Sequence, residues 1–246
     1  EQRDDGVVHV QAGVVLDQLD QSLARRGRLL GPDPANSAVT TVGSMAALDA
    51  SGSRRLAYGS MRDHVVEIEA VLATGEAVRL STHKIPEHPP SREDDPIGFL
   101  THGVAALLDR YAAEIEAYGR RAAPDRSGYR LDNIRRGDDI DLVRLLVGSE
   151  GTLALFSSLY LKTRKLPAHV GVALLLFNSL DRAAQAATVL IDKGPQLRAC
   201  DLMDRRHLSL AREEDPRYEL LIPQSIEAVL LVEYAAEDST PLWKKL

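Results

Sequence analysis

The chain has 246 residues, of which 44% are hydrophobic and 27% charged, which is the composition of a globular protein with one large domain or two smaller ones. Its net charge of −6 provides no basic field that would attract nucleic acid, and its single cysteine, Cys200, excludes an internal disulfide or a cysteine-based metal site. We expect no signal peptide, no membrane span and a cytoplasmic location, because no apolar run is long enough to cross a bilayer.

The first part of the chain is predicted to contain a strand, a helix and a turn. Residues 7–10 alternate as a strand does, and residues 14–26 carry apolar side chains at the spacing of an amphipathic helix, which Gly27 ends. The segment Gly31-Pro-Asp-Pro34 is predicted to be a turn, because its two prolines fix the backbone and bar regular strand pairing.

A β-hairpin and a long helix are predicted in the middle of the chain. Residues 65–73 and 77–80 alternate as strands do, and the tight turn Thr74-Gly-Glu76 joins them. Residues 82–95 are rich in proline, histidine and acidic residues and are expected to form a loop. Residues 99–120 have the periodicity of a helix.

Two clusters of small residues stand out because such residues let the backbone approach a ligand closely. One is Thr41–Gly52 (TVGSMAALDASG), and the other is Gly148–Thr152 (GSEGT), which we expect to lie between an apolar strand at 142–147 and a second strand at 153–161. A dinucleotide cofactor needs backbone amides for its pyrophosphate, although neither cluster is a G-x-G-x-x-G or P-loop motif. The alternative interpretation is that the small residues only permit close packing of two layers.

The last part of the chain begins a new pattern at Leu166–Pro167, where we place a domain boundary. Strands are predicted at residues 170–177, 199–203 and 228–234, with a helix at residues 180–192. The order strand, helix, strand and later strand predicts the start of a ferredoxin-like α+β module.

Five short motifs follow one another along the chain: Gly31-Pro-Asp-Pro34, Thr41-Val-Gly-Ser44, Asp49-Ala-Ser-Gly52, Tyr58-Gly59 and Gly148-Ser-Glu-Gly-Thr-Leu153. In order and spacing they resemble the FAD-linked oxidase family, the flavoproteins of the vanillyl-alcohol oxidase and para-cresol methylhydroxylase type. Within it they look most like the 2-hydroxy-acid branch, which contains the D chain of glycolate oxidase and the D-lactate and D-2-hydroxyglutarate dehydrogenases.

The resemblance implies an α+β fold in two parts. Residues 1–165 would be the second half of a PCMH-type FAD-binding domain, named after para-cresol methylhydroxylase, and residues 166–246 the start of a ferredoxin-like cap domain for the substrate. Because the chain begins with Glu1 rather than Met, we expect it to be part of a longer protein. The first FAD subdomain would then precede residue 1, and the catalytic residues would follow residue 246.

The resemblance also implies FAD as the cofactor, lined by main-chain groups and small side chains. The predicted cofactor-binding residues are Pro34, Ala35, Ser37, Thr40, Thr41, Val42, Gly43, Ser44, Ala47, Leu48, Ser51, Tyr58, Gly59, Gly148, Glu150, Gly151 and Leu153. Asp49 stands where the family has Asn or Arg, and we expect it to point away from the phosphates, which it would repel. Tyr129 is interpreted either as a core residue or as one that faces the flavin. No residue of the chain is predicted to be catalytic or to bind a metal.

The implied function is oxidation of a 2-hydroxy acid, such as D-lactate, glycolate or D-2-hydroxyglutarate, to the 2-oxo acid by an FAD-dependent dehydrogenase or oxidase. We expect the chain alone to be inactive, the electron acceptor to be a carrier that the sequence does not identify, and nucleic acid not to be a partner; a homodimer is left open. Two alternatives remain. One is another flavin oxidase, acting on an alcohol or a sugar, and the other is a non-catalytic scaffold or binding module.

Overall fold

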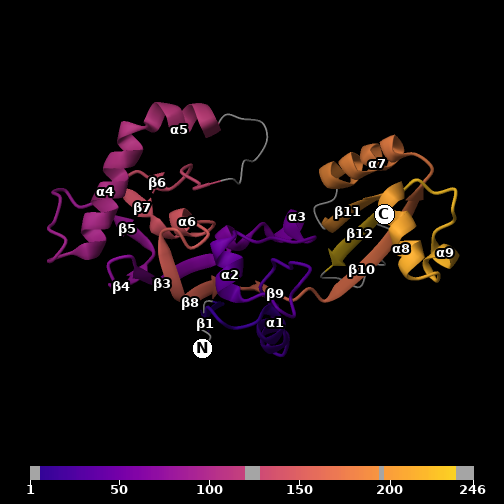
Figure 1. Ribbon diagram of the computed structural model, residues 1–246, viewed down its shortest axis with the longest axis horizontal. Helices are drawn as coiled ribbons and strands as arrows, with labels where there is room; N and C mark the ends of the chain where they lie inside the picture. Colours follow the sequence, from indigo (N-terminus) through magenta and orange to yellow (C-terminus); the bar gives the residue numbers. More distant parts are fainter. Residues whose placement is uncertain (1–5, 120–127, 194–196, 237–246) are drawn as a thin grey trace. The chain divides into compact units, whose positions relative to one another are not determined.

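The computed structural model describes residues 6–119, 128–193 and 197–236, and the chain divides into two compact units (Figure 1). Unit 1 contains Glu1–Leu30, Pro34–Ala50 and Ser60–Arg164, and unit 2 contains Gly31–Asp33, Ser51–Gly59 and Lys165–Leu246. The segment 34–50 therefore belongs to unit 1, although the short segments on both sides of it belong to unit 2.

An antiparallel sheet of four strands, in the order β1-β8-β3-β4, forms the centre of unit 1. Its strands are β1 (Val7–Gln11), β3 (Val65–Leu72), β4 (Ala77–Leu80) and β8 (Ala154–Lys162), which confirms four of the five strands predicted in this part of the chain. Val10 and Ile68 both pair with Leu159, so the central strand β8 joins two strands that precede it by many residues.

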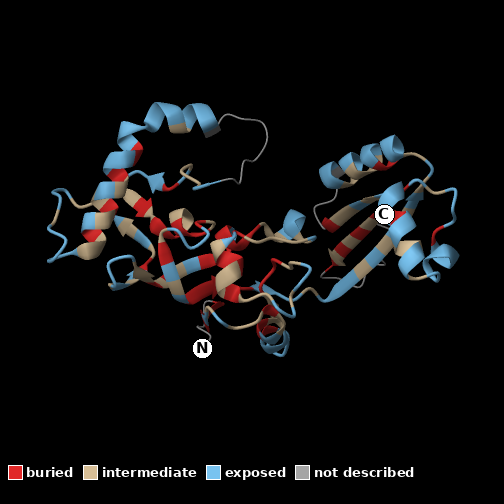
Figure 2. Ribbon diagram, in the orientation of Figure 1, coloured by how far each residue is buried: buried red, intermediate tan, exposed pale blue. Residues whose placement is uncertain are grey.

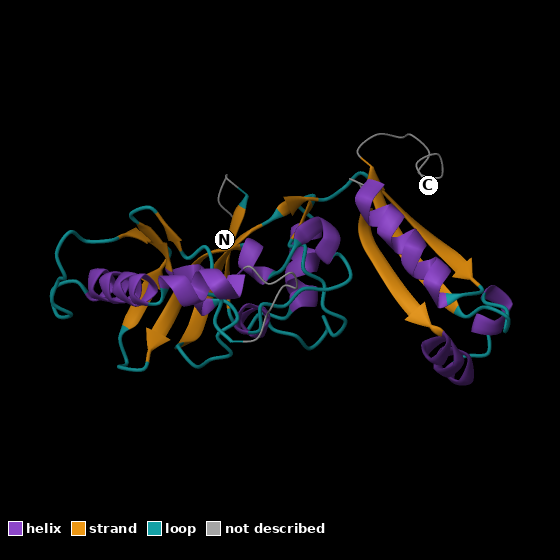
Figure 3. Ribbon diagram, turned by 90° about the horizontal axis from the view of Figure 1, so that it is seen from above, coloured by secondary structure: helices purple, strands orange, loops and turns teal. Residues whose placement is uncertain are grey.

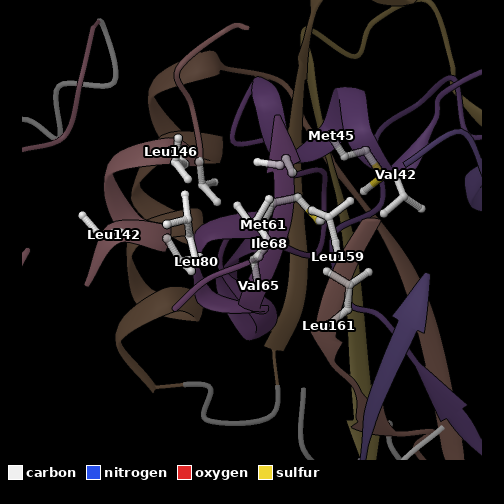
Figure 4. Packing of buried hydrophobic residues seen from close by; sticks show 14 of the residues in the cluster. Val42, Met45, Met61, Val65, Ile68, Leu80, Leu142, Leu146, Leu159 and Leu161 are labelled. Carbon is white, nitrogen blue, oxygen red and sulfur yellow. The ribbon is translucent and has the colours of Figure 1, made fainter. Parts of the chain in front are cut away.

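The core of unit 1 combines apolar side chains from this sheet with those of α1 (Leu16–Ala24), α2 (Val42–Ala47) and α6 (Leu142–Leu146). Figure 4 shows side chains of this core, and Figure 2 shows that the buried residues concentrate on the sheet strands and on one side of the helices. The fully buried members include Leu16, Leu23, Met45, Met61, Ile68, Leu159 and Leu161. Each such side chain contributes roughly 1.5–3 kcal/mol by leaving water.

Two of these helices differ from the sequence-based expectation. The apolar run 142–147 was expected to be a strand, and this prediction is wrong because Asp141 starts helix α6 by accepting a hydrogen bond from Arg144 N at 3.0 Å. Helix α2 occupies the first cluster of small residues. Its cap is Thr41, whose hydroxyl accepts a hydrogen bond from Ser44 N at 3.3 Å.

The segment between the hairpin and α6 contains a small sheet and two helices. Strand β5 (Thr82–Lys84) pairs with β7 (Asp139–Asp141), which also pairs with β6 (Arg135–Arg136). The expectation of a loop over residues 82–95 is therefore wrong at its start, where three residues find a partner that is distant in the sequence.

The predicted long helix is divided into α4 (Pro96–Arg110) and α5 (Ala112–Gly119), and Arg120 lies outside the described residues. The carboxylate of Asp95 caps α4 by accepting a hydrogen bond from Gly98 N at 2.9 Å, which explains why the helix begins before Phe99. The remaining short elements are β2 (Arg28–Leu29), which pairs with β9 (Arg164–Lys165), and the 3₁₀ turn η1 (Met61–Asp63).

Unit 2 is built on a three-stranded sheet in the order β10-β12-β11, with α7 packed against one face (Figure 3). Its elements are α3 (Arg55–Tyr58), β10 (His169–Phe177), α7 (Leu180–Lys193), β11 (Leu197–Asp204), α8 (Arg205–Glu214), α9 (Tyr218–Leu221) and β12 (Ala228–Ala236). Strand β12 is antiparallel to both neighbours, so β10 and β11 run parallel with β12 between them. This split β-α-β arrangement confirms the predicted ferredoxin-like α+β start.

Replacing Asp141 by Ala tests the capping interaction that makes residues 142–146 a helix. We expect the free energy of unfolding to fall by about 1 kcal/mol, because the N–H of Arg144 loses its carboxylate acceptor. Urea titration followed by circular dichroism measures the loss. The control Asp138→Ala changes an acid that caps no helix, and an equal loss in both variants would contradict this role of Asp141.

Candidate functional site

Residues 41–50 of the first small-residue cluster and the whole second cluster lie side by side in unit 1. Gly148 N donates a hydrogen bond to Ala46 O at 2.9 Å, and Glu150 N donates to Ala47 O, also at 2.9 Å. The end of α2 and the turn 148–152 are thus joined through their backbones. They form two walls at a fixed spacing, although β3, β4 and α6 lie between them in the sequence.

A buried ion pair between Arg62 and Asp49 connects the residues next to the two walls in the interior of unit 1. The Arg62 side chain donates from Nε to Asp49 Oδ2 at 3.2 Å, and its other nitrogens donate to the carbonyl oxygens of Arg144 and Val147. Burial lowers the pKa of the Arg62 guanidinium, and the adjacent Asp49 carboxylate opposes that shift. The Asp49 carboxylate is therefore directed into unit 1 and occupied by Arg62.

Gly148 has a conformation and a position that no other residue could share without cost. Its φ of +85° is in the left-handed region, and a Cβ atom there would lie 2.7 Å from the Arg62 guanidinium and 3.3 Å from Asp49 Cβ. Because the guanidinium is fixed by its hydrogen bonds, it has little freedom to move aside. The glycine at this position is explained by packing against the ion pair.

The start of α2 is tied to the loop after β1. Val42 N donates to Val14 O at 2.9 Å, and Gly43 N donates to Ala12 O at 2.8 Å. A Cβ atom at Gly43 would lie 2.7 Å from the Cβ of Ala12. The close-packing interpretation therefore explains Gly43, and two amides that could serve a pyrophosphate are engaged within the fold.

The outer side of the two walls has the features of a surface that a cofactor could cover. Leu48, at the end of α2, is 64% exposed, and Val39 is also exposed. Gly151 has a φ of +77°, and no atom lies within 4 Å of the position that its Cβ would take. The buried hydroxyl of Ser149 has no hydrogen-bond partner among the described residues. The open backbone and the exposed apolar side chains fit a flavin dinucleotide, and the Ser149 hydroxyl adds an unsatisfied polar atom beneath the second wall.

Tyr129 is tied to the second wall. Its hydroxyl donates to Thr152 Oγ1 at 2.7 Å, since Thr152 Oγ1 itself donates to Ser149 O at 2.5 Å. The side chain is exposed, so the interpretation of Tyr129 as a core residue is wrong. No local sequence pattern indicated this contact, because the two residues are far apart in the chain.

The other predicted cofactor-binding residues are divided between the units. Those from Pro34 to Leu48 and from Gly148 to Leu153 lie in unit 1, whereas Ser51, Tyr58 and Gly59 lie in unit 2. In unit 2 the Arg198 guanidinium lies over the ring of Tyr58, with its central carbon 5.3 Å from the ring centroid. That these residues bind the cofactor stays a prediction.

Both parts of the chain match models of known protein families. Residues 1–81 match the family model described as FAD binding domain, and residues 166–243 match the model described as FAD linked oxidases, C-terminal domain. These two matches define a flavoprotein and indicate FAD as its cofactor, as the motifs predicted. The chain belongs to the FAD-linked oxidase family, which confirms the predicted family.

Curated relatives point to the same branch of the family. D-2-hydroxyglutarate dehydrogenase of Escherichia coli (strain K12) is 30% identical over 246 residues, which cover 96% of this chain and 24% of the relative. Glycolate oxidase subunit GlcD of Bacillus subtilis (strain 168) is 26% identical over 91% of this chain and 37% of its own length. The chain thus spans between 24% and 37% of the length of these relatives.

A solved structure of alkyldihydroxyacetonephosphate synthase shares the fold, with a TM-score of 0.62 and 17% identity over 96% of this chain and 36% of that one. This likeness supports the PCMH-type fold. Within the described ranges, no helix is both long and apolar enough to cross a membrane.

Substituting Ala for Gly148 tests the packing of the two walls on Arg62. We expect a loss of about 3 kcal/mol of unfolding free energy, because the new methyl group adds overpacking to backbone strain. The matched control is Gly75→Ala, whose φ of +86° is almost identical but whose Cβ would meet nothing within 4 Å, so only strain of about 1 kcal/mol is expected. Urea unfolding of both variants measures the difference, and equal losses would show that Arg62 moves aside freely.

Proposed function

We propose that the protein to which this chain belongs is an FAD-dependent dehydrogenase or oxidase that converts a 2-hydroxy acid to the 2-oxo acid. D-2-hydroxyglutarate, D-lactate and glycolate are the proposed substrates, because the names of the curated relatives refer to these acids. The observation that carries the proposal is the backbone pairing of residues 46–47 with residues 148 and 150, in a chain that matches an FAD binding domain over residues 1–81 and the C-terminal domain of FAD linked oxidases over residues 166–243.

FAD, when bound, supplies the acceptor for the hydride that leaves C2 of the hydroxy acid. The chain would hold the cofactor in place through segments 34–48 and 148–153. Leu48 and Val39 would offer apolar contact, and the open backbone at Gly151 would allow close approach. The Arg62–Asp49 pair would keep the two segments at constant spacing, which removes part of the ordering cost of binding.

The proposal extends to the organisation of the protein. Residues 1–165 would act as the second half of the FAD-binding domain, and residues 166–246 as the start of the substrate domain. The proposal also includes a cytoplasmic location and a separate electron acceptor. It allows a homodimer as one possible assembly of the protein.

Leu48→Glu tests whether the exposed end of α2 contacts the cofactor. We expect the dissociation constant for FAD to rise about tenfold or more, since the substitution removes an apolar contact and adds a negative charge near a diphosphate. Quenching of flavin fluorescence measures the affinity. The control Leu220→Glu changes a leucine that is 87% exposed in α9 of unit 2, and it should leave the affinity unchanged.

The substrate class is tested by anaerobic reduction of the FAD-loaded protein. D-2-hydroxyglutarate, D-lactate and glycolate are added separately, and we expect one of them to bleach the visible flavin absorption while an equal amount of the 2-oxo acid appears. Protein that shows no saturable FAD binding would contradict the flavoenzyme proposal. Bound flavin that none of the three acids reduces would contradict the substrate class alone.

A further inference from the structure

Four charged side chains in unit 2 connect segments that are far apart in the sequence. Glu233, in β12, accepts hydrogen bonds from Arg54 Nε at 3.0 Å and Nη2 at 3.2 Å, and it also lies 3.0 Å from Arg198 Nη1. Asp33 accepts a hydrogen bond from the backbone N of Arg54 at 3.1 Å and lies 3.5 Å from its Nη1. Arg54 thus bridges two carboxylates from different parts of the chain.

This ion-pair network, Asp33–Arg54–Glu233–Arg198, is balanced in charge and is shielded from water at Glu233 and Arg198, whereas the side chains of Asp33 and Arg54 are 25% and 38% exposed. The Arg198 side chain is 6% exposed and that of Glu233 15%. Burial raises the pKa of the Asp33 carboxyl, and the hydrogen bond to Glu233 raises the pKa of the Arg54 guanidinium. Two cations face two carboxylates, so removing one partner would leave a shielded charge without compensation.

The network also presses two short segments together. A Cβ atom at Gly52 would lie 2.2 Å from Asp33 O, so the segments 31–33 and 51–59 are in direct backbone contact. The position of Arg198 over the ring of Tyr58 adds a second contact to the segment 51–59. Both segments are thereby fastened to the sheet of unit 2.

These two segments are the ones that flank residues 34–50, which carry most of the predicted cofactor-binding residues. We propose that Arg54, Arg198 and Glu233 are positioning residues, which hold the segments 31–33 and 51–59 and so fix both ends of the cofactor segment 34–50. The proposal rests on the proposed function in one respect, because it takes 34–50 to be an FAD-binding segment.

An ion pair between neighbouring residues on the surface would not hold distant segments of the chain together. Arg217 and Asp215 are two residues apart and Arg217 is 86% exposed, so their pair constrains only its own turn. Arg54 and Glu233 are 179 residues apart, and their forked hydrogen bond closes a long loop of chain. Closing such a loop restricts the segments that lead into and out of it.

The experiment compares Arg54→Ala, Glu233→Gln and the double variant with the unsubstituted protein, with Arg217→Ala as the control. Hydrogen exchange read by mass spectrometry reports on the segments 34–50 and 51–59, with α7 as the internal reference. We expect exchange in both segments to become about tenfold faster in each single variant, with α7 unchanged. The effect of the double variant should be smaller than the two single effects combined, because both substitutions remove the Arg54–Glu233 pair, while each also removes one contact of its own, Arg54 with Asp33 and Glu233 with Arg198.

FAD affinity provides a second readout from the same proteins. We expect the dissociation constant for FAD to rise about tenfold in Arg54→Ala and in Glu233→Gln, but not in Arg217→Ala. Arg54→Lys keeps the charge but loses the fork, so it should recover only part of the affinity and of the slow exchange. If the network only stabilised the fold of unit 2, the loss of FAD affinity in the Arg54 and Glu233 variants would be accompanied by faster exchange in α7.

Two outcomes would overturn the proposal. One is faster exchange in 51–59 with unchanged exchange in 34–50, because the network would then anchor only its own segment. The other is unchanged FAD affinity in variants whose 34–50 exchange is faster. If Arg54→Ala also loosens α7, the same comparisons are made with Arg54→Lys. Absence of FAD binding by the unsubstituted protein would contradict the proposed function instead, and the exchange data would still decide the positioning role.

Discussion

One buried guanidinium fixes the geometry on which the candidate site depends. Arg62 reaches from the turn before β3 to the carboxylate of Asp49 at the end of α2, and to two carbonyl oxygens at the end of α6. Without it, the buried Asp49 carboxylate would keep only the hydrogen bond from the backbone N of residue 62, and two carbonyl oxygens would lose a buried donor, which is more costly than losing an exposed ion pair. The glycine at 148 follows from the space that this side chain requires, whereas the left-handed conformation of Asp49 ends α2, with Asp49 N donating to Ala46 O and Ala50 N to Met45 O.

The strands of four or more residues could be predicted because each one alternates or forms an apolar run bounded by turn residues, as in the hairpin 65–80, whereas strands of two or three residues such as β5 are too short to show a pattern. Helix α6 could not be distinguished from a strand, since a short apolar run fits a buried strand equally well and the capping role of Asp141 depends on its backbone geometry. Helix α2 was missed because glycine and serine have low helix propensity, and packing against Ala12 decides its conformation.

The motifs indicated which segments form the candidate site, but not what holds them there. The contacts of Arg62, the hydrogen bond from Tyr129 to Thr152 and the pairing of Arg54 with Glu233 each join residues without any shared local pattern. Such contacts follow from tertiary packing, which a single sequence does not encode by spacing. Glu150, which stands between Ser149 and Gly151, has a φ of +54°, and this left-handed conformation marks the strained turn.

The place of β12 between β10 and β11 has a consequence for the order of events during protein synthesis. Neither β10 nor β11 has a hydrogen-bonded neighbour in its sheet until the ribosome has delivered residues 228–236. The nascent unit 2 therefore exposes two unpaired strands and the apolar side of α7 for the time needed to translate this interval, which is the condition under which chaperones engage growing chains. A translational pause shortly after β10 would prolong that exposure, whereas one after β12 would come too late to matter.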